Sequence, residues 1–466
     1  MNVLAAFLLP HPPLIIKEVG RGQENGIEKT RMAYEQVGQK IEELKPETII
    51  IVSPHSIMYS DYFHISPGAV AHGDFSKFGA GKSLSVDVEY DQDFVTALSE
   101  SAMHQGIMAG TQGEKGAALD HGTSVPLAMI QEHYKDFKVV RIGISGQSVV
   151  QHYRFGKIIT ETAKTLNRKV VLIASGDMSH KLLEEGPYGY APEGPIFDNK
   201  IQQIMANGDF GELMKIKSSF CEAAAECGYR SLVILAGALD GKDLDSKILS
   251  YEGPFGVGYL VASFLPSGDN PNRQFDLAFE KQEKTRLEKE QSMEDPFVQL
   301  ARKSLEAKIK EKREIKINEI PEELLNDELT KKQAGVFVTL KKHGELRGCI
   351  GTTFPIQKSI GAEILHNAIS AGLEDPRFDS VSIDELPYLE YSVDVLGNAE
   401  PAPSMESLDP MEYGVIVESG FRKGLLLPNL EGIDTPEKQV SIALQKAGIK
   451  DGDPYTMKRF KVTRHK

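Results

Sequence analysis

Short, almost uninterrupted apolar segments alternate with longer amphipathic segments over the first 265 residues. The apolar segments, which predict strands buried on both faces of a sheet, are residues 3–9, 48–52, 139–144, 170–174 and 258–264. The amphipathic segments, which predict helices, are residues 27–44, 93–105, 156–166 and 231–239. This alternation predicts an α/β N-terminal domain with a mostly parallel or mixed central sheet.

The pattern changes between residues 266 and 295. Residues 266–273 form a turn-like cluster rich in proline, asparagine and glycine, and residues 280–294 are mostly charged or amide side chains with few apolar ones. Such a composition predicts a linker, either a flexible tether or an exposed helix. We therefore expect a first domain over residues 1–265 and a second over residues 296–466.

The second half mixes helical and strand-like segments without regular alternation. Helices are predicted over residues 296–310 and 360–371. Strands are predicted over residues 335–340, 345–353, 389–396 and 414–417. This mixture predicts a smaller α+β C-terminal domain.

Length and composition exclude several functional classes. A chain of 466 residues is long enough for two hydrophobic cores. Its net charge of −14 disfavours a nucleic-acid surface, and no stretch approaches the roughly 20 apolar residues that span a membrane. Three cysteines, without a CxxC pair, favour a reducing cytoplasm over a disulfide framework or a zinc ribbon. The oligomeric state is left open.

Polar residues suited to metal binding follow the predicted strands of the first half. Strand ends are where ligand sites collect in α/β sheets. Two histidines and one carboxylate with open positions form the usual site of non-haem Fe(II) oxygenases, and zinc or copper are alternative metals for such donors. Imidazoles beyond those that bind the metal indicate proton transfer. The candidates are His11, His55, His121, His180 and Glu252.

Structural roles compete with these functional ones. His11 and His55 lie in rigid turns next to proline, which favours metal binding. Glu252 could instead belong to a simple Tyr-Glu-Gly-Pro turn, and His121 could cap the segment that begins at Gly122. His180 could be a turn residue, although catalysis or metal contact is favoured.

Two further residues of the first half adjoin these candidates. Asp177 is expected to orient a histidine rather than bind the metal. Cys227 precedes an apolar helix and could approach the site, but a buried structural thiol is the favoured interpretation.

Five motifs, taken in order, resemble one known family over roughly residues 1–265. They are His-Pro-Pro-Leu-Ile-Ile-Lys-Glu, Ser-Pro-His-Ser, Leu-Asp-His-Gly-Thr-Ser, Ser-Gly-Asp-Met-Ser-His and Tyr-Glu-Gly-Pro-Phe-Gly. Together they resemble the LigB-like class III extradiol ring-cleaving dioxygenases and the related Memo proteins, some of which use a thiolate ligand. The resemblance implies Fe(II) bound by His11, His55 and Glu252, with an aromatic diol and dioxygen as substrates. It also implies His180 as the acid/base and His121 as a hydrogen-bonding partner of substrate or oxygen.

The sharpest motif of the second half is Leu-Arg-Gly-Cys-Ile-Gly-Thr, which contains Arg347 and Cys349. With its flanking segments it resembles the AMMECR-type domain over roughly residues 296–466. Arg347 could lower the pKa of the thiol or hold an anion, so a ligand groove with these two residues at its floor is one hypothesis. His366, Asp375 and Arg377 are further candidates for that groove. A tight turn with a buried Cys349 is the equal alternative.

Joined in one chain, the two resemblances match the AmmeMemoRadiSam system protein A arrangement, whose name records association with a radical SAM protein. Three functions follow as hypotheses. The first is a cytoplasmic Fe(II) dioxygenase acting on an aromatic diol. The second is a metal-binding accessory protein that works with a radical SAM partner without cleaving rings, and the third is a zinc-dependent hydrolase.

Overall fold

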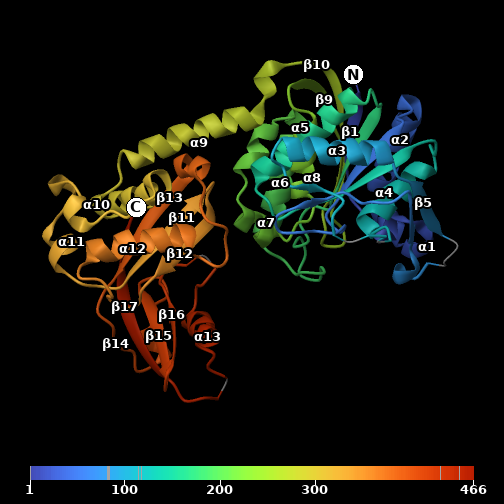
Figure 1. The fold of residues 1–466 in the computed structure, drawn as a ribbon. Coiled ribbons are helices and arrows are strands. Elements are labelled where there is room, and N and C mark those ends of the chain that lie inside the picture. Colours follow the sequence, from blue (N-terminus) through green and yellow to red (C-terminus); the bar gives the residue numbers. More distant parts are fainter. Residues whose placement is uncertain (1, 81–83, 114, 117, 431, 451) are drawn as a thin grey trace. The chain divides into compact units, whose positions relative to one another are not determined.

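The chain divides into two units, each with its own sheet and helices (Figure 1). The computed structural model describes residues 2–80, 84–113, 115–116, 118–430, 432–450 and 452–466. The first unit is Met1–Glu280 and the second is Lys281–Lys466. The division falls inside helix α9 (Phe275–Gln291), within the stretch that the sequence predicts to be a linker.

A mixed sheet with a parallel centre organises the first unit, as the sequence predicts. Its strands run in the order β7-β2-β8-β1-β10-β9. The first four are mutually parallel, and β10 is antiparallel to both β1 and β9. The strands are β1 (Val3–Leu9), β2 (Thr48–Ser53), β7 (Lys138–Gly143), β8 (Val170–Ser175), β9 (Lys242–Glu252) and β10 (Tyr259–Asp269).

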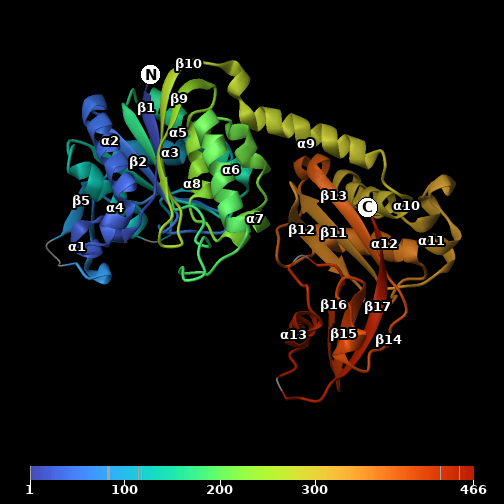
Figure 2. The same ribbon diagram turned by 180° about the vertical axis from the view of Figure 1, so that it is seen from behind.

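Helices cover both faces of this sheet, which explains why its central strands are apolar at every position. In β2, Ile49 and Ile51 pack into one core with α2 (Glu28–Leu44) and α4 (His121–Gln131). Ile50 and Val52 pack into the opposite core. The helices of that second core are α3 (Gln92–His104), α5 (Val149–Thr165), α6 (Glu193–Asn207) and α8 (Tyr229–Ala238). Figures 1 and 2, seen from opposite sides, show the two layers.

The sequence missed strand β9 and the extension of β10. In β9 half-buried residues alternate with exposed ones, as expected of an edge strand that has no continuous apolar run. β10 continues through Pro266 to Asp269 while paired with β9, so the sheet reaches beyond residue 265. Helix α5 begins at Val149, earlier than predicted, because the Ser148 side chain caps it.

Shorter elements complete the first unit. They are α1 (Lys17–Gly20), β3 (Phe63–His64), β4 (Val70–Asp74), β5 (Ser85–Glu89), β6 (Ala109–Gly110) and α7 (Ser218–Ala224). None of the helices in the described ranges of either unit combines the length and the apolar character needed to cross a membrane.

An antiparallel sheet with helices forms the second unit, in agreement with the predicted α+β class. The strand order is β12-β11-β13-β17-β15-β16, and β14 pairs with β17. The strands are β11 (Val336–Lys342), β12 (Glu345–Gly351), β13 (Leu389–Leu396), β14 (Glu400–Pro401), β15 (Tyr413–Ser419), β16 (Arg422–Leu426) and β17 (Thr456–His465). The helices are α10 (Pro296–Glu306), α11 (Asp327–Lys331), α12 (Ile360–Leu373) and α13 (Pro436–Ala447). Helices α10 and α12 bury the apolar face of β11, and α13 packs on β15 and β16.

Candidate metal centre

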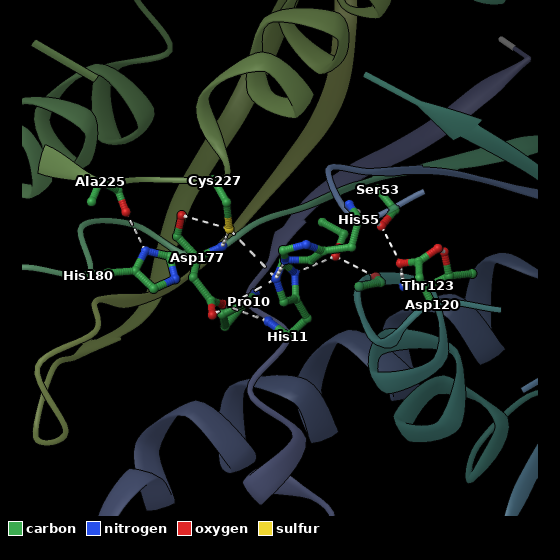
Figure 3. Close-up of polar contacts among 12 residues, drawn as sticks. Pro10, His11, Ser53, His55, Asp120, Thr123, Asp177, His180, Ala225 and Cys227 are labelled. Carbon is green, nitrogen blue, oxygen red and sulfur yellow. Dashed lines mark hydrogen bonds and ion pairs between the residues drawn. The ribbon is translucent and has the colours of Figure 1, made fainter. Parts of the chain in front are cut away.

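Parallel strands bring two distant histidines together at one edge of the first sheet (Figure 3). β8 lies between β2 and β1 and is parallel to both, so the carboxyl ends of all three strands meet. Pro10 separates β1 from His11, and Pro54 separates β2 from His55. The Nε2 atoms of the two imidazoles lie 3.0 Å apart, with the rings nearly perpendicular.

The third donor beside this pair is a thiol. Cys227 lies just before α8, and its Sγ atom is 3.7 Å from His11 Nε2. Ligand atoms of His11, His55 and Cys227 all lie within 4.8 Å of one another. The favoured interpretation of Cys227 as a structural thiol therefore does not describe its position. Two imidazoles and one thiol are a donor set that suits zinc, iron or copper.

Glu252, predicted as the third ligand, has other partners in the structure. Its Oε2 atom accepts hydrogen bonds from the backbone N–H and the hydroxyl of Thr30, both at 2.8 Å. Thr30 lies in the first turn of α2, whose own N-cap residue, Ile27, supplies no side-chain hydrogen bond. The carboxylate thus satisfies a free N–H group and the positive end of a helix. Glu252 is not part of the donor cluster among the described residues.

A serine at the end of β8 fixes the orientation of His11. The Ser175 hydroxyl donates to the carbonyl of Gly122 at 2.5 Å, and it lies 2.9 Å from His11 Nδ1. Because the only hydroxyl proton is used for Gly122, the oxygen accepts from Nδ1–H. His11 Nε2 is then left with its lone pair, facing His55 and Cys227. This is the arrangement that metal-binding imidazoles have in proteins.

Burial keeps both imidazoles neutral. It lowers the pKa of His11 well below the ordinary value, and the neighbouring His55, His121 and His180 lower it further. Burial also lowers the pKa of His55 to about 4, with a further contribution from His121. Neutral imidazole is the form that binds metal, so this pair is ready for a cation at neutral pH.

Burial also favours the uncharged forms of the thiol and of a nearby carboxyl. Burial raises the pKa of Cys227 well above its ordinary value, so binding a metal through Sγ would release a proton. It also raises the pKa of Asp177 to about 7. Asp177 Oδ1 accepts from the backbone N–H of His11 at 2.8 Å, so it holds the backbone of this histidine, whereas the ring is bonded to Ser175.

His121, on α4, stacks on His55 and meets His11 edge-on. It is the first residue of that helix rather than the end of a strand. The plane of its ring is inclined by 27° to that of His55, with centroids 4.2 Å apart. The cap of α4 is the side chain of Asp120, which accepts from the backbone N–H of Thr123, so His121 is free of the capping role.

His180 is held by a turn next to Cys227. Its Nδ1–H donates to the carbonyl of Ala225 at 2.5 Å, and its backbone N–H donates to Ala224. Ala225 has a positive φ of 52°, which is costly for a residue other than glycine. Since Nδ1 carries the proton, Nε2 is an acceptor, and burial lowers the pKa of the ring below its ordinary value.

Asp120, which the sequence did not single out, supports the His55 side of the cluster. It accepts from the Ser53 hydroxyl at 2.5 Å, and its charge counteracts the fall in the His55 pKa. A Cβ atom at Gly122 would lie 2.5 Å from Ser53 Oγ and 3.3 Å from the His55 ring, so glycine is required there. Ser53, Asp120 and Ser175 share one signal, a small polar side chain at the last residue of a strand or at a helix cap.

Ion pairs connect the charged residues of the candidate site in the second unit. Arg347 binds Glu385 through two hydrogen bonds of 3.0 Å, and Asp375 binds Arg377. The backbone N–H of Cys349 donates to Asp375, and its carbonyl accepts from Arg377. Burial raises the pKa of the Cys349 thiol, opposite to the expected effect of Arg347. His366, the remaining candidate, is exposed.

A cavity of about 1300 Å³ lies elsewhere in the first unit. It follows edge strand β7 and the β4–β5 hairpin, and none of the three clustered donors lines it. Arg141 lines this cavity and lies 3.8 Å from the Asp120 carboxylate. The cavity walls carry side chains of both charges, so its volume alone does not identify a ligand.

Two family models match this chain, one in each of its two structural units. The family model described as catalytic LigB subunit of aromatic ring-opening dioxygenase matches residues 5–262. The AMMECR1 family model matches residues 298–466.

Some known relatives match the whole chain, and others match only part of it. A Clostridium acetobutylicum protein is 42% identical over 100% of both chains. A Thermotoga maritima protein is 46% identical over 37% of this chain and 98% of its own. Among solved structures, an uncharacterised Pyrococcus horikoshii protein is 30% identical, covering 36% of this chain and 88% of its own, with a TM-score of 0.33. An uncharacterised Escherichia coli K12 protein is 14% identical, covering 56% and 99%, with a TM-score of 0.37.

Proposed function

Since the chain belongs to the LigB family of aromatic ring-opening dioxygenases and also carries an AMMECR1 domain, we propose that its first unit is a metal-dependent enzyme. The proposed reaction is the opening of an aromatic diol by dioxygen. The observation that supports it best is the convergence of His11, His55 and Cys227 from three separate segments. A metal held by these three donors would have positions left to bind a diol and dioxygen.

The metal in this proposal is ferrous iron, with zinc and copper as alternatives. Ferrous iron held by His11, His55 and Cys227 would supply the electron transfer that allows dioxygen to react with a bound diol. Both oxygen atoms enter the opened product, so no further reductant is consumed. The fixed Nδ1–H of His11 and the low pKa values of both imidazoles suit this role.

His180 is the proposed acid/base. Its Nδ1–H is committed to Ala225, and its ring is neutral at neutral pH, so Nε2 is able to take a proton from a diol hydroxyl. His121, stacked on His55, is the proposed hydrogen-bonding partner of the substrate or of oxygen. Neither residue belongs to the donor cluster, so each should be replaceable without loss of the metal.

The thiol in the donor set favours a second candidate function. Extradiol sites with two histidines and one carboxylate use a hard anionic oxygen, whereas Cys227 offers a softer sulfur, which suits zinc or copper(I) more closely. A protein with this donor set could bind metal without cleaving rings, as an accessory to a radical SAM partner. A zinc-dependent hydrolase is the remaining alternative.

An anaerobic reconstitution separates these candidates. The full chain is loaded with Fe(II), mixed with a panel of catechols and then exposed to air, while ring-opened product is followed by its absorbance. We expect turnover in the wild-type protein. His180→Ala should abolish turnover and keep iron, and His11→Ala should lose iron. His104→Ala, an exposed histidine at the end of α3, is the control.

Each alternative has its own result. Stoichiometric iron with no turnover on any diol would support the accessory function. Tight zinc binding and no reaction with dioxygen would support the hydrolase.

The three cysteines, all free in the structure, fit the proposed cytoplasmic location.

A further inference from the structure

Two large aromatic side chains at the surface of the first unit contact histidines of the candidate centre. The Phe78 ring is 39% exposed and lies edge-on to His121, with centroids 5.6 Å apart. The Tyr188 ring is 64% exposed and lies edge-on to His180, with centroids 5.5 Å apart. Single exposed apolar residues are ordinary, but these two each touch one of the two histidines outside the donor cluster.

The two aromatics border the centre from different sides. Ring contacts connect Phe78 through His121 and His55 to buried His11. Tyr188 connects to the same centre through His180. In Figure 3, His180 lies on one side of His11, and Asp120, the residue before His121, lies on the other. A molecule bound at the metal would therefore have an aromatic side chain near His180, the proposed acid/base, and another near His121, the proposed hydrogen-bonding partner.

Both side chains stand on turns that are held in place. The backbone N–H of Phe78 donates to buried Phe75, and the Arg21 guanidinium binds the carbonyl of Gly79. The loop that carries Tyr188 is closed by a bridge between Leu182 and Tyr190. Fixed aromatic walls are suited to recognise a ring rather than a flexible chain, because aromatic pairs prefer stacked or edge-on geometry.

We propose that Phe78 and Tyr188 are specificity-determining residues, each placed to contact a second ring or flat apolar substituent of a substrate that extends toward its own side of the centre. This rests on the proposed function, since the chelating diol of the same molecule occupies the metal. The preferred substrates are then aryl-substituted diols rather than catechol itself. A small polar substrate would leave both aromatic rings in water.

The test compares two diols on the Fe(II)-loaded full chain without oxygen. Catechol and 2,3-dihydroxybiphenyl are titrated, and binding is followed by the absorbance of the complex. We expect the biphenyl diol to bind up to about tenfold more tightly, since an added ring contact contributes up to roughly that factor. Phe78→Ala or Tyr188→Ala, whichever lies on the side that the added ring occupies, should reduce this preference about three- to tenfold, with iron stoichiometry unchanged.

Controls keep the outcome specific. Phe78→Leu keeps apolar bulk and should lose part of the preference, and Tyr188→Phe should keep it. Phe421→Ala removes a fully exposed ring in the second unit. It should change neither the preference for the biphenyl diol nor the iron stoichiometry. Equal binding of the two diols, or an unchanged preference in both alanine variants, would overturn this inference alone. Iron loading with no binding of either diol would overturn the proposed function and this inference with it.

Discussion

Cys227 in the first unit and Cys349 in the second both adjoin a glycine and stand near ionisable side chains, but their surroundings differ. Beside Cys227, the Nε2 atoms of His11 and His55 face each other at 3.0 Å. Both of these imidazoles have lowered pKa values. Beside Cys349, the charged groups are already paired, as Arg347 is with Glu385.

The difference shows that residue type alone does not identify a ligand site. Both regions contain a thiol, a carboxylate and nitrogen donors. In the first, one ligand atom each from His11, His55 and Cys227 converges on a common point, as metal ligands do. In the second, Asp375 and Arg377 satisfy both each other and the backbone of Cys349. The two arginines of that region are therefore engaged by carboxylates of the second unit.

The largest expected effect is that of removing the thiol donor. Cys227→Ser should weaken metal binding by more than about 100-fold, beyond the effect of losing an outer hydrogen-bond partner. Cys221→Ser, at a buried free thiol in α7, should leave the affinity unchanged. Competition with a chromophoric chelator measures both. Equal affinities for Cys227→Ser and wild type would remove the distinction between the two regions.

Next comes the group that orients His11. Ser175→Ala should weaken metal binding about 10- to 100-fold, because Nδ1–H loses its acceptor and the ring is no longer fixed. Ser124→Ala is the matched control, since this buried serine hydroxyl makes no hydrogen bond among the described residues. The same chelator competition applies. An unaltered affinity in Ser175→Ala would show that the ring needs no such support.

The pH dependence of the metal-free protein gives a smaller effect. His55 has a pKa of about 4 when folded and an ordinary value of 6.5, so the unfolded state takes up its proton first as pH falls. The contribution of His55 to the free energy of unfolding is complete above pH 6.5 and is lost as pH falls towards 4. We expect a loss of about 1–2 kcal/mol, allowing for partial exposure. Urea unfolding at several pH values should show a shallower fall for His55→Gln, and parallel curves would contradict this.

The smallest effects are expected in the second unit. Cys349→Ser should leave metal affinity within about twofold, and the native thiol should be alkylated at least about tenfold more slowly than the unfolded one. Burial raises its pKa, and the thiolate is the reactive form. Mass spectrometry of labelled peptides measures this rate. Rapid labelling in the native protein would place a reactive thiol in the second unit after all.

Much of the fold is determined by the sequence because buried strand positions must be occupied by apolar residues, which gives a regular pattern along the chain. β1 and β13 have the predicted bounds, since strands packed on one or both faces must be apolar at each buried position. β9 was missed because an edge strand with partly exposed residues has no such constraint. The linker composition predicted either a tether or a helix, and α9 shows a helix.

The candidate site, like the fold, was only partly predictable from the sequence. The sequence by itself determined that His11 and His55 would converge, because both follow parallel strands that end at one edge of the sheet. Only the tertiary structure decided that Cys227 rather than Glu252 joins them. That choice depends on which turn packs against the strand ends and on which side chain the α2 terminus engages. Such contacts join residues far apart in the chain, so no local pattern records them.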